Sequence, residues 1–270
     1  MSLRKDKKVT EFVPLDKKRI EADMAARGVL ADVKVYELIP STNTAAEEYA
    51  RENPNVCAIF VAEEQSAGSG RLGRRFHSPR GAGLYMTLLF TPSGVKTDGV
   101  WLTTLAAVAV RRAIKRLSTL DPKIKWVNDL YLDGKKAAGI LAKASLDEKG
   151  GIKYSVIGIG INVLDIPLPE EIKEIATSLE AAGGGRIDRN LLASAIAEEF
   201  FSALNENCEA LIAEYKKASI VLGKRVRVIK PDLEYYATAT DITESGELLL
   251  LREDGKKEIL STGEVSIRDF

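Results

Sequence analysis

Apolar and polar positions repeat along this chain with two different periods, which divide it into expected helices and strands. A spacing of three to four residues predicts amphipathic helices, whereas alternation or a short apolar run predicts strands. The expected helices cover residues 15–27, 44–53, 101–117 and 188–215. The expected strands of the same region cover residues 33–38, 57–63, 84–90, 124–127, 130–132, 137–144 and 154–162. Helices and strands interspersed in this way predict an α+β fold with a mixed β-sheet flanked by helices.

Residues with capping and turn preferences lie at several of these boundaries. Asp16 is placed to cap the first helix, and Gly28 to end it. Thr44 and Glu47 have the spacing of a capping box at the start of the second helix. The pair Asp133–Gly134 lies between two strands and predicts a hairpin turn.

The pattern changes near residue 222, where helical periodicity gives way to closely spaced short strands. These strands cover residues 225–229, 235–241, 248–252, 257–260 and 265–267. A run of short strands over about 50 residues predicts a small β-barrel. We therefore expect an N-terminal tail and helix at 1–32, an α+β domain at 33–221 and a small β domain at 222–270.

Composition and charge exclude several classes of protein. Lys plus Arg and Asp plus Glu total 39 each, so no overall positive field attracts nucleic acid. The single histidine, His77, rules out zinc sites that need several histidines. Cys57 and Cys208 lack metal-ligand spacing and suit a reducing cytoplasm. The apolar stretch that begins at Trp101 is stopped by Arg111, too soon to cross a bilayer. We expect a cytoplasmic protein without a membrane partner.

A loop rich in glycine and arginine follows the strand at 57–63. Gly68, Gly70 and Gly73 match G-x-G-x-x-G, but no helix opens at the third glycine and no acidic residue follows about 20 positions later. A dinucleotide-binding fold is therefore rejected, and the absence of Gly-Lys-Ser/Thr excludes a Walker loop. The loop contains four arginines within ten residues, namely Arg71, Arg74, Arg75 and Arg80. Glycines that expose backbone N–H groups beside arginines favour an anion-binding loop over a merely solvated one.

Three other short segments place polar groups at the ends of expected elements. Ser41-Thr42-Asn43 precedes a helix, and these residues either cap it or bind a polar ring. Lys125 comes three and four residues before Asn128 and Asp129, which also suits an ordinary strand that ends in a turn. Gly158-Ile159-Gly160-Ile161-Asn162 closes a strand, where glycines permit close approach of a ligand or another backbone.

Taken together and in this order, the four segments resemble the biotin protein ligase family. The matching stretches are Ser41-Thr42-Asn43, Gln65 with Gly68-Ser69-Gly70-Arg71-Leu72-Gly73-Arg74, Lys125-Trp126-Val127-Asn128-Asp129-Leu130 with Ala138-Gly139-Ile140-Leu141, and Gly158-Ile159-Gly160-Ile161-Asn162. The resemblance extends from about Val35 to the C-terminus and implies a C-terminal SH3-like barrel. Two positions depart from the family pattern: Ser69 stands where an arginine is usual, and Val127 where a proline is usual.

The resemblance implies an enzyme that joins biotin to a protein with ATP. Biotin would first be converted to biotinyl-5′-AMP with release of pyrophosphate, and then transferred to a lysine of a biotin carboxyl carrier protein. The implied biotin contacts are Ser41, Thr42, Asn43, Gln65, Ser69, Gly70, Arg71 and Lys125. The implied ATP contacts are Arg71, Arg74, Phe76, Lys125, Asn128 and Asn162. Lys125 and Arg71 would be catalytic, with Lys125 bridging the carboxylate and the α-phosphate, and Mg²⁺ would accompany ATP, with Asp129 as a candidate ligand.

Other functions within reach of this resemblance remain open. A lipoate ligase would share the fold, but the arginine loop and Lys-Trp-x-Asn-Asp favour biotin. A ligase that also represses transcription would need an N-terminal helix-turn-helix, for which the 40 residues before Ser41 leave little room. We therefore expect a monofunctional form without sequence-specific DNA binding. A non-catalytic biotin-binding protein would not need Lys125 beside the arginine loop. A homodimer is compatible with the sequence, which does not identify the carrier.

Overall fold

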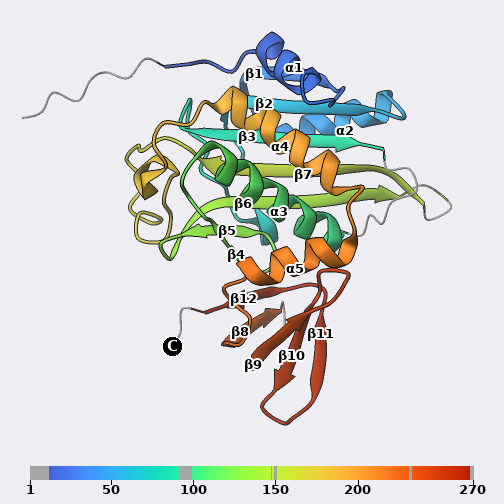
Figure 1. The fold of residues 1–270 in the computed structure, drawn as a ribbon, viewed down its shortest axis with the longest axis vertical. Coiled ribbons are helices and arrows are strands. Elements are labelled where there is room, and N and C mark those ends of the chain that lie inside the picture. Colours follow the sequence, from blue (N-terminus) through green and yellow to red (C-terminus); the bar gives the residue numbers. More distant parts are fainter. Residues whose placement is uncertain (1–11, 92–98, 147, 149–150, 231–232, 268–270) are drawn as a thin grey trace, which may run out of the picture.

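The computed structural model describes residues 12–91, 99–146, 148, 151–230 and 233–267. Its larger part is a sheet covered by helices, and its smaller C-terminal part is a separate sheet beneath it (Figure 1). The expected tail at residues 1–11 lies outside the described residues, so only the helix that follows it can be compared. That helix is α1 (Lys17–Ala25), and the Asp16 side chain caps it as predicted by accepting from the Arg19 N–H at 2.8 Å.

The larger sheet has seven strands in the order β1-β2-β3-β7-β6-β5-β4. These strands are β1 (Asp32–Ile39), β2 (Cys57–Gln65), β3 (Gly83–Phe90), β4 (Lys123–Lys125), β5 (Asp129–Leu132), β6 (Lys135–Leu146) and β7 (Ile152–Asn162). The β1 and β2 strands pair in parallel, and the other neighbours pair antiparallel. The predicted mixed sheet is therefore confirmed.

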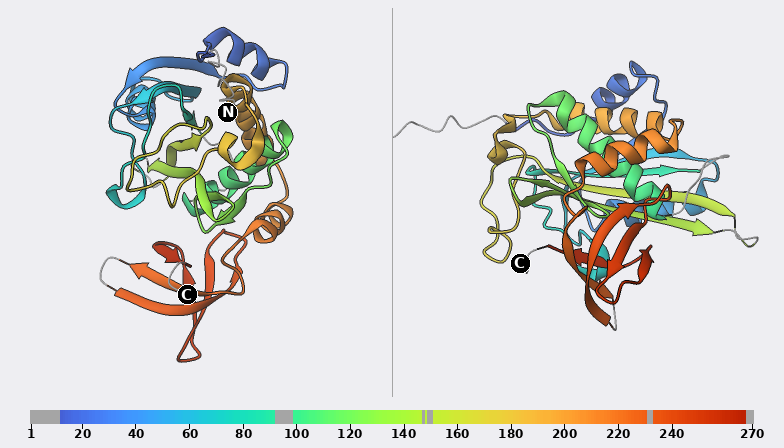
Figure 2. Two further views of the ribbon diagram at one scale, coloured as in Figure 1. Left: turned by 90° about the vertical axis from the view of Figure 1, so that its left-hand side faces the viewer. Right: turned by 60° about the horizontal axis from the view of Figure 1, so that its bottom comes forward.

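Helices cover both faces of this sheet, and each face has its own apolar core. The helices are α2 (Thr42–Glu52), α3 (Gly99–Leu117), α4 (Arg189–Ala203) and α5 (Cys208–Ala218). Along β2, Ile59 and Val61 belong to the core beneath α1, α3 and α4, whereas Ala58 and Phe60 pack with Ala46 and others on α2. Burial on both faces explains why β2 and β3 read as continuous apolar runs. The right-hand view of Figure 2 shows α1, α3 and α4 stacked above the sheet.

Two predicted helices differ from the observed ones. The second helix does not begin at a Thr44 capping box; Ser41 is its N-cap, in extended conformation, and its carbonyl accepts from the Ala45 N–H at 3.1 Å. The single helix expected over 188–215 is two helices, α4 and α5. The Asn207 side chain caps α5 by accepting from the Glu209 and Ala210 N–H groups. A new helix therefore begins at this cap, although the apolar periodicity of the sequence continues across the break.

The hairpin between β5 and β6 has the predicted turn, but the preceding strand is shorter than predicted. Asp133 and Gly134 both have positive φ values, 48° and 77°, as a two-residue hairpin turn requires. The β4 strand ends at Lys125 rather than at Val127, and the peptide bond between Trp126 and Val127 is cis. Lys125 is therefore the last residue of its strand, and it lines a cavity together with Glu264 and Ser266 of β12.

The C-terminal region forms the predicted small β domain, as a second sheet whose strands pair antiparallel. Its strands are β8 (Arg225–Lys230), β9 (Leu233–Ile242), β10 (Leu248–Arg252), β11 (Lys257–Leu260) and β12 (Glu264–Ser266), in the order β11-β10-β9-β8-β12. Its core contains Val226, Val228, Ala239 and Leu250. The proposed division of the chain at 33–221 and 222–270 stays a prediction.

A buried contact joins the two parts of the molecule. The Trp126 indole Nε1 donates to the Gly246 carbonyl at 2.9 Å, and the turn that carries Gly246 packs against Thr104 of α3. The β12 strand of the smaller sheet lies beside the glycine- and arginine-rich loop, where Glu264 pairs with Arg74. No helix among the described residues has the length and hydropathy needed to span a membrane.

Candidate active site

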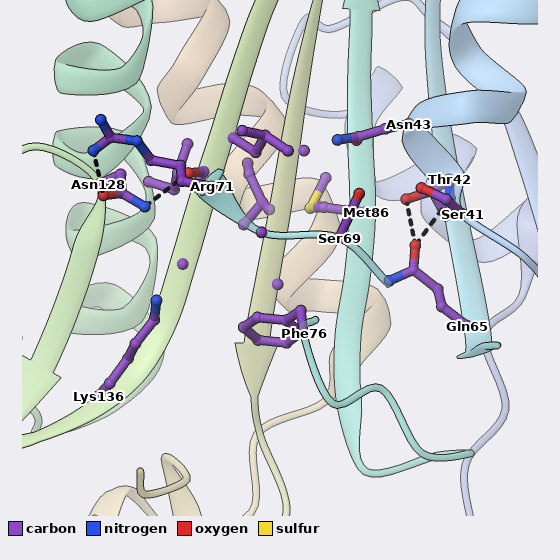
Figure 3. A pocket seen from close by; sticks show the side chains of 17 residues that line it. Ser41, Thr42, Asn43, Gln65, Ser69, Arg71, Phe76, Met86, Asn128 and Lys136 are labelled. Atoms are coloured by element: carbon purple, nitrogen blue, oxygen red, sulfur yellow. Dashed lines mark hydrogen bonds between the residues drawn. The ribbon is translucent and has the colours of Figure 1, made fainter. Parts of the chain in front are cut away.

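Two adjoining cavities lie along the arginine loop (residues 68–76). The smaller one is also lined by the start of α2 and by strands β3, β6 and β7 (Figure 3). The smaller one is lined by seven of the eight predicted biotin contacts, namely Ser41, Thr42, Asn43, Gln65, Ser69, Gly70 and Arg71. The larger one is lined by all six predicted ATP contacts, namely Arg71, Arg74, Phe76, Lys125, Asn128 and Asn162. The fold thus brings together residues that are far apart in sequence.

The closed end of the smaller cavity consists of uncharged hydrogen-bonding groups. Because Ser41 is the N-cap of α2, residues 41–43 lie at the first turn of the helix, facing the end of β2. Thr42 donates to the Gln65 Oε1 atom from its backbone N–H at 2.9 Å and from its hydroxyl at 3.1 Å. Gln65 Nε2 in turn donates to the Ser78 hydroxyl at 3.2 Å. These bonds hold the polar side chains in fixed positions around the cavity (Figure 3).

Two residues of this polar group, Ser78 and Thr87, were not predicted. Thr87, fully buried in β3, has its hydroxyl 2.8 Å from Thr42 Oγ1 and 2.6 Å from Asn43 Oδ1. The sequence contains a signal for it: a lone polar residue in the apolar run Gly-Leu-Tyr-Met-Thr-Leu-Leu-Phe must have a buried hydrogen-bond partner.

Glycines around the site make room for its side chains and turns. A Cβ on Gly158 would lie 2.3 Å from Asn43 Oδ1, and one on Gly160 would lie 2.7 Å from the Phe76 ring. The strand glycines therefore admit neighbouring side chains of the site, rather than another backbone. In the loop, a Cβ on Gly68 would lie 2.6 Å from the Phe76 carbonyl, and Gly73 has φ 72°. Substitution at either loop position would distort the turn.

The arginine loop is tied to both domains. Arg71 donates to Asn128 Oδ1 at 3.1 Å and to the Gly263 carbonyl at 2.7 Å. Arg74 pairs with both carboxylate oxygens of Glu264, at 3.0 and 2.8 Å. Burial lowers the pKa of Arg71, whereas the hydrogen bond and charge of Glu264 raise the pKa of Arg74. Arg71, Arg74 and Arg75 line the larger cavity; Arg80 pairs instead with Glu37.

Comparison with known proteins is consistent with this architecture. Residues 35–162 match the biotin/lipoate A/B protein ligase family, and residues 221–268 match the biotin protein ligase C-terminal domain. The biotin--[acetyl-CoA-carboxylase] ligase of Mycobacterium tuberculosis is 30% identical over 268 residues, which cover 93% of this chain and 95% of that protein. The chain belongs to the biotin protein ligase family.

Two further relatives extend the comparison. A biotin protein ligase from Aquifex aeolicus, solved in complex with biotin and ATP, has a TM-score of 0.73 and 26% identity; the match covers 88% of this chain and 98% of that one. The bifunctional ligase/repressor BirA of Bacillus subtilis is 33% identical over 232 residues, which cover 84% of this chain and 71% of that protein. The predicted fold class and enzyme class are confirmed.

Two lysines, Lys125 and Lys136, line the cavities at different places. Lys125, predicted to contact biotin, lines the larger cavity but not the smaller one, and its Nζ lies 5.9 Å from the centre of the Tyr131 ring. Lys136, which was not predicted, lines both cavities, and its Nζ lies 2.6 Å from Asp129 Oδ1. A β-bulge between β5 and β6 shifts the register near Tyr131. A bulge changes which side chains face a given side, so strand alternation alone could not have placed Lys136.

The two departures from the family pattern have clear positions. Ser69 lines the smaller cavity, and its backbone forms an isolated bridge with Arg75 that closes the loop. Val127 is buried, and its carbonyl accepts from the Tyr215 hydroxyl at 3.0 Å. At both positions the contact is therefore made by the backbone rather than by the side chain that departs from the family pattern.

Proposed function

We propose that this biotin protein ligase converts biotin and ATP to biotinyl-5′-AMP and then transfers biotin to a lysine of a biotin carboxyl carrier protein. The observation that carries the proposal is the junction of the two cavities. One end offers uncharged hydrogen-bonding groups and the other offers arginines, and Arg71 and Lys136 line both. A ligand with a neutral polar ring and a carboxylate would extend from the first end to the second.

The reaction requires two anions to meet. A carboxylate is a poor electrophile, so one biotin carboxylate oxygen bonds to the α-phosphorus of ATP while the bond to pyrophosphate breaks. The amine of the carrier lysine then attacks the carbonyl carbon, AMP leaves, and the amine loses a proton. At an effective dielectric constant of about 20, two unit charges 4 Å apart repel by roughly 4 kcal/mol. Fixed cations at the junction offset that repulsion without a covalent enzyme intermediate.

Each proposed role follows from a position. Ser41, Thr42, Asn43 and Gln65 take the ureido ring, and Ser69 and Gly70 line the same cavity towards the carboxylate, with the Gly70 N–H donated to the Arg74 carbonyl at 2.7 Å. We assign the cation that bridges the carboxylate and the α-phosphate to Lys136, together with Arg71, because these residues line both cavities. Lys125, expected from the sequence to bridge these two groups, is assigned to the nucleotide instead, because it lines the larger cavity but not the smaller one.

The nucleotide groups occupy the larger cavity in this proposal. Arg74 receives the departing pyrophosphate, and the Phe76 ring flanks adenine. Phe76 is held in place by an edge-on contact with Tyr85, with ring centres 6.4 Å apart. Asn162 donates from Nδ2 to the Thr177 carbonyl at 3.0 Å, which orients its amide oxygen for an adenine amino group. Asn128, whose Oδ1 accepts from Arg71, lines the same cavity.

Mg²⁺ is expected to enter with the triphosphate, whose charge it would partly neutralise. Among the residues that the structure describes, no three His, Cys, Asp or Glu side chains form a metal cluster. Mg²⁺ bound mainly by phosphates and water needs one or two carboxylates. Asp129 and Glu264 both line the larger cavity, so the donor set fits this mode. We propose Asp129 as the ligand.

The remaining proposals concern partner and setting. The acceptor is a biotin carboxyl carrier protein or domain, and the enzyme acts in the cytoplasm, with a homodimer left open. A net charge of zero gives no bulk attraction for DNA, so we propose no sequence-specific DNA binding. A mobility shift that shows tight, salt-resistant preference for one promoter would contradict this last proposal.

The decisive test is ATP–pyrophosphate exchange with biotin or lipoate supplied separately. We expect exchange that depends on biotin, followed by biotin transfer to a purified carrier domain. Exchange that is faster with lipoate would assign the chain to the lipoate branch of the same fold. Biotin binding without exchange would show a non-catalytic binding protein.

A further inference from the structure

Asn128 connects the arginine loop to strand β6 through both ends of its carboxamide (Figure 3). Its Oδ1 atom accepts from the Arg71 Nη1 group at 3.1 Å, and its Nδ2 group donates to the Ile140 carbonyl at 3.1 Å. Its own main-chain carbonyl accepts from the Ile140 N–H at 2.9 Å. Asn128 is therefore bonded to both main-chain groups of Ile140 and to the guanidinium of Arg71.

The two partners of this carboxamide permit one orientation. A guanidinium can only donate and a main-chain carbonyl can only accept, so the amide oxygen must face Arg71 and the amide nitrogen must face Ile140. Exchanging the two ends would bring two donors together at Arg71 and two acceptors together at Ile140. An ionised aspartate of the same size could accept from Arg71, but it would have no hydrogen to give to Ile140. This position therefore uses both the donor and the acceptor of an amide.

Two uncharged acceptors hold Arg71 in place. Besides its bond to Asn128, the guanidinium donates from Nη2 to the Gly263 carbonyl at 2.7 Å. Arg74, by contrast, pairs with the Glu264 carboxylate, which offsets its charge. Neutral anchors on two different nitrogens fix the plane of the Arg71 guanidinium without cancelling its charge. That charge is therefore held ready for the anions at the junction, where Arg71 lines both cavities.

We propose that Asn128 is a positioning residue, which fixes the Arg71 guanidinium at the junction of the two cavities instead of binding the nucleotide itself. This inference rests on the proposed function, in which Arg71 stabilises the biotin carboxylate and the α-phosphate as they meet. A positioning residue acts through its partner, so the effect of removing Asn128 should disappear once Arg71 is absent. A direct nucleotide contact would contribute with or without Arg71.

The test is a double-mutant cycle on Asn128 and Arg71. Biotinyl-5′-AMP formation is measured in single turnover, with saturating biotin and with ATP below its KM, so that binding and chemistry both contribute. Arg71→Ala should lower the rate about a hundredfold or more, as for the loss of one fixed charge stabiliser. Asn128→Ala should lower it about tenfold or more, as for one lost hydrogen bond to a charged group. The double variant should lie within about twofold of Arg71→Ala alone.

Asn162→Ala is the matched control. Asn162 lines the same larger cavity, and its Nδ2 group also donates to a main-chain carbonyl, that of Thr177. The proposed function assigns Asn162 to adenine, so the losses from removing Asn162 and Arg71 should multiply. Urea unfolding of each variant measures any loss of stability. If Asn128→Ala does not fold, Asn128→Ser enters the same cycle, because its hydroxyl can still donate a hydrogen bond but the shorter side chain lacks the second atom that reaches Arg71.

The outcomes separate this inference from the proposed function. If the losses for Asn128 and Arg71 multiply as they do for Asn162, Asn128 either binds the nucleotide or only supports the fold, and the inference is overturned. A wild-type rate in a folded Asn128→Ala variant would overturn it as well. If the wild-type chain forms no biotinyl-5′-AMP, the proposed function itself fails.

Discussion

Arg74 and Glu264 form a two-point ion pair between the arginine loop and the last strand of the C-terminal sheet, with N–O distances of 3.0 and 2.8 Å. Next to this pair, Arg71 donates to the Gly263 carbonyl at 2.7 Å. The loop that carries Arg71 and Arg74 is therefore held by the C-terminal sheet, which contains none of the four sequence motifs. An incoming triphosphate must compete with the Glu264 carboxylate for Arg74.

The first prediction concerns this tether. Glu264→Gln removes the charge that holds Arg74, so the ligand-free loop should be cleaved by trypsin at Arg71–Arg75 several times faster than in the wild-type chain. Biotin plus ATP should protect both proteins, because the ligands supply replacement anions. Glu253→Gln is the matched control, since Glu253 pairs with Arg225 elsewhere in the same domain. Equal cleavage of all three proteins without ligands would contradict the role of the tether.

The second prediction follows from the pKa of Glu264. Burial raises this pKa, but the hydrogen bond and charge of Arg74 outweigh burial, and the net pKa lies below the ordinary 4.5. A lowered folded-state pKa contributes stability that is present above pH 4.5 and is lost as pH falls through the folded-state value. Since the pair is partly exposed, the wild type should exceed Glu264→Gln by at most about 1 kcal/mol at pH 7. Urea unfolding should show this difference vanishing under acidic conditions; a difference that grows as pH falls would refute it.

The third prediction distinguishes the two lysines. Lys136→Gln should lower kcat for adenylate formation by about a hundredfold or more, because removing one fixed charge stabiliser typically costs 10²–10³ in rate. Lys125→Gln should mainly raise the KM for ATP and leave biotin binding close to normal. Single-turnover adenylate formation and biotin titration would measure both effects. Loss of biotin binding in Lys125→Gln alone would return the bridging role to Lys125.

Motifs with local chemistry could be placed from sequence, whereas contacts created by tertiary packing could not. The predicted biotin and ATP sets converged because both lie at ends of strands that the apolar runs identify. Lys136 was missed because a β-bulge shifts the register of its strand, and neither its neighbours nor its spacing in sequence signals a bulge. Glu264 was missed because it meets Arg74 from 190 positions away, and a single glutamate in a short exposed strand has no distinguishing pattern.

The helix errors have a similar origin. Thr44 and Glu47 satisfy a capping box on spacing alone, yet the helix starts two residues before Thr44, at Thr42, because Ser41 adopts the extended N-cap conformation. The side chains of Ser41 and Thr42 are thereby available to the cavity rather than to the helix end. Local rules thus identified the helix but misassigned the residues at its start, which are the ones that line the smaller cavity.

The last prediction concerns the contact that holds the two domains together. Gly246 has φ 84°, and a Cβ there would lie 2.3 Å from Thr104 Oγ1, beside the carbonyl that accepts from Trp126. Gly255 has nearly the same φ, 80°, with open space around it. Gly255→Ala should therefore lower the free energy of unfolding only by the cost of the left-handed backbone, about 1–2 kcal/mol. Gly246→Ala should lower it by a further 1–3 kcal/mol or so, because the added Cβ overlaps Thr104. Because that overlap pushes the C-terminal sheet away from the arginine loop, only Gly246→Ala should also raise the KM for ATP. Equal losses of unfolding free energy in the two variants, measured by urea denaturation, would show that the domain contact is loosely packed.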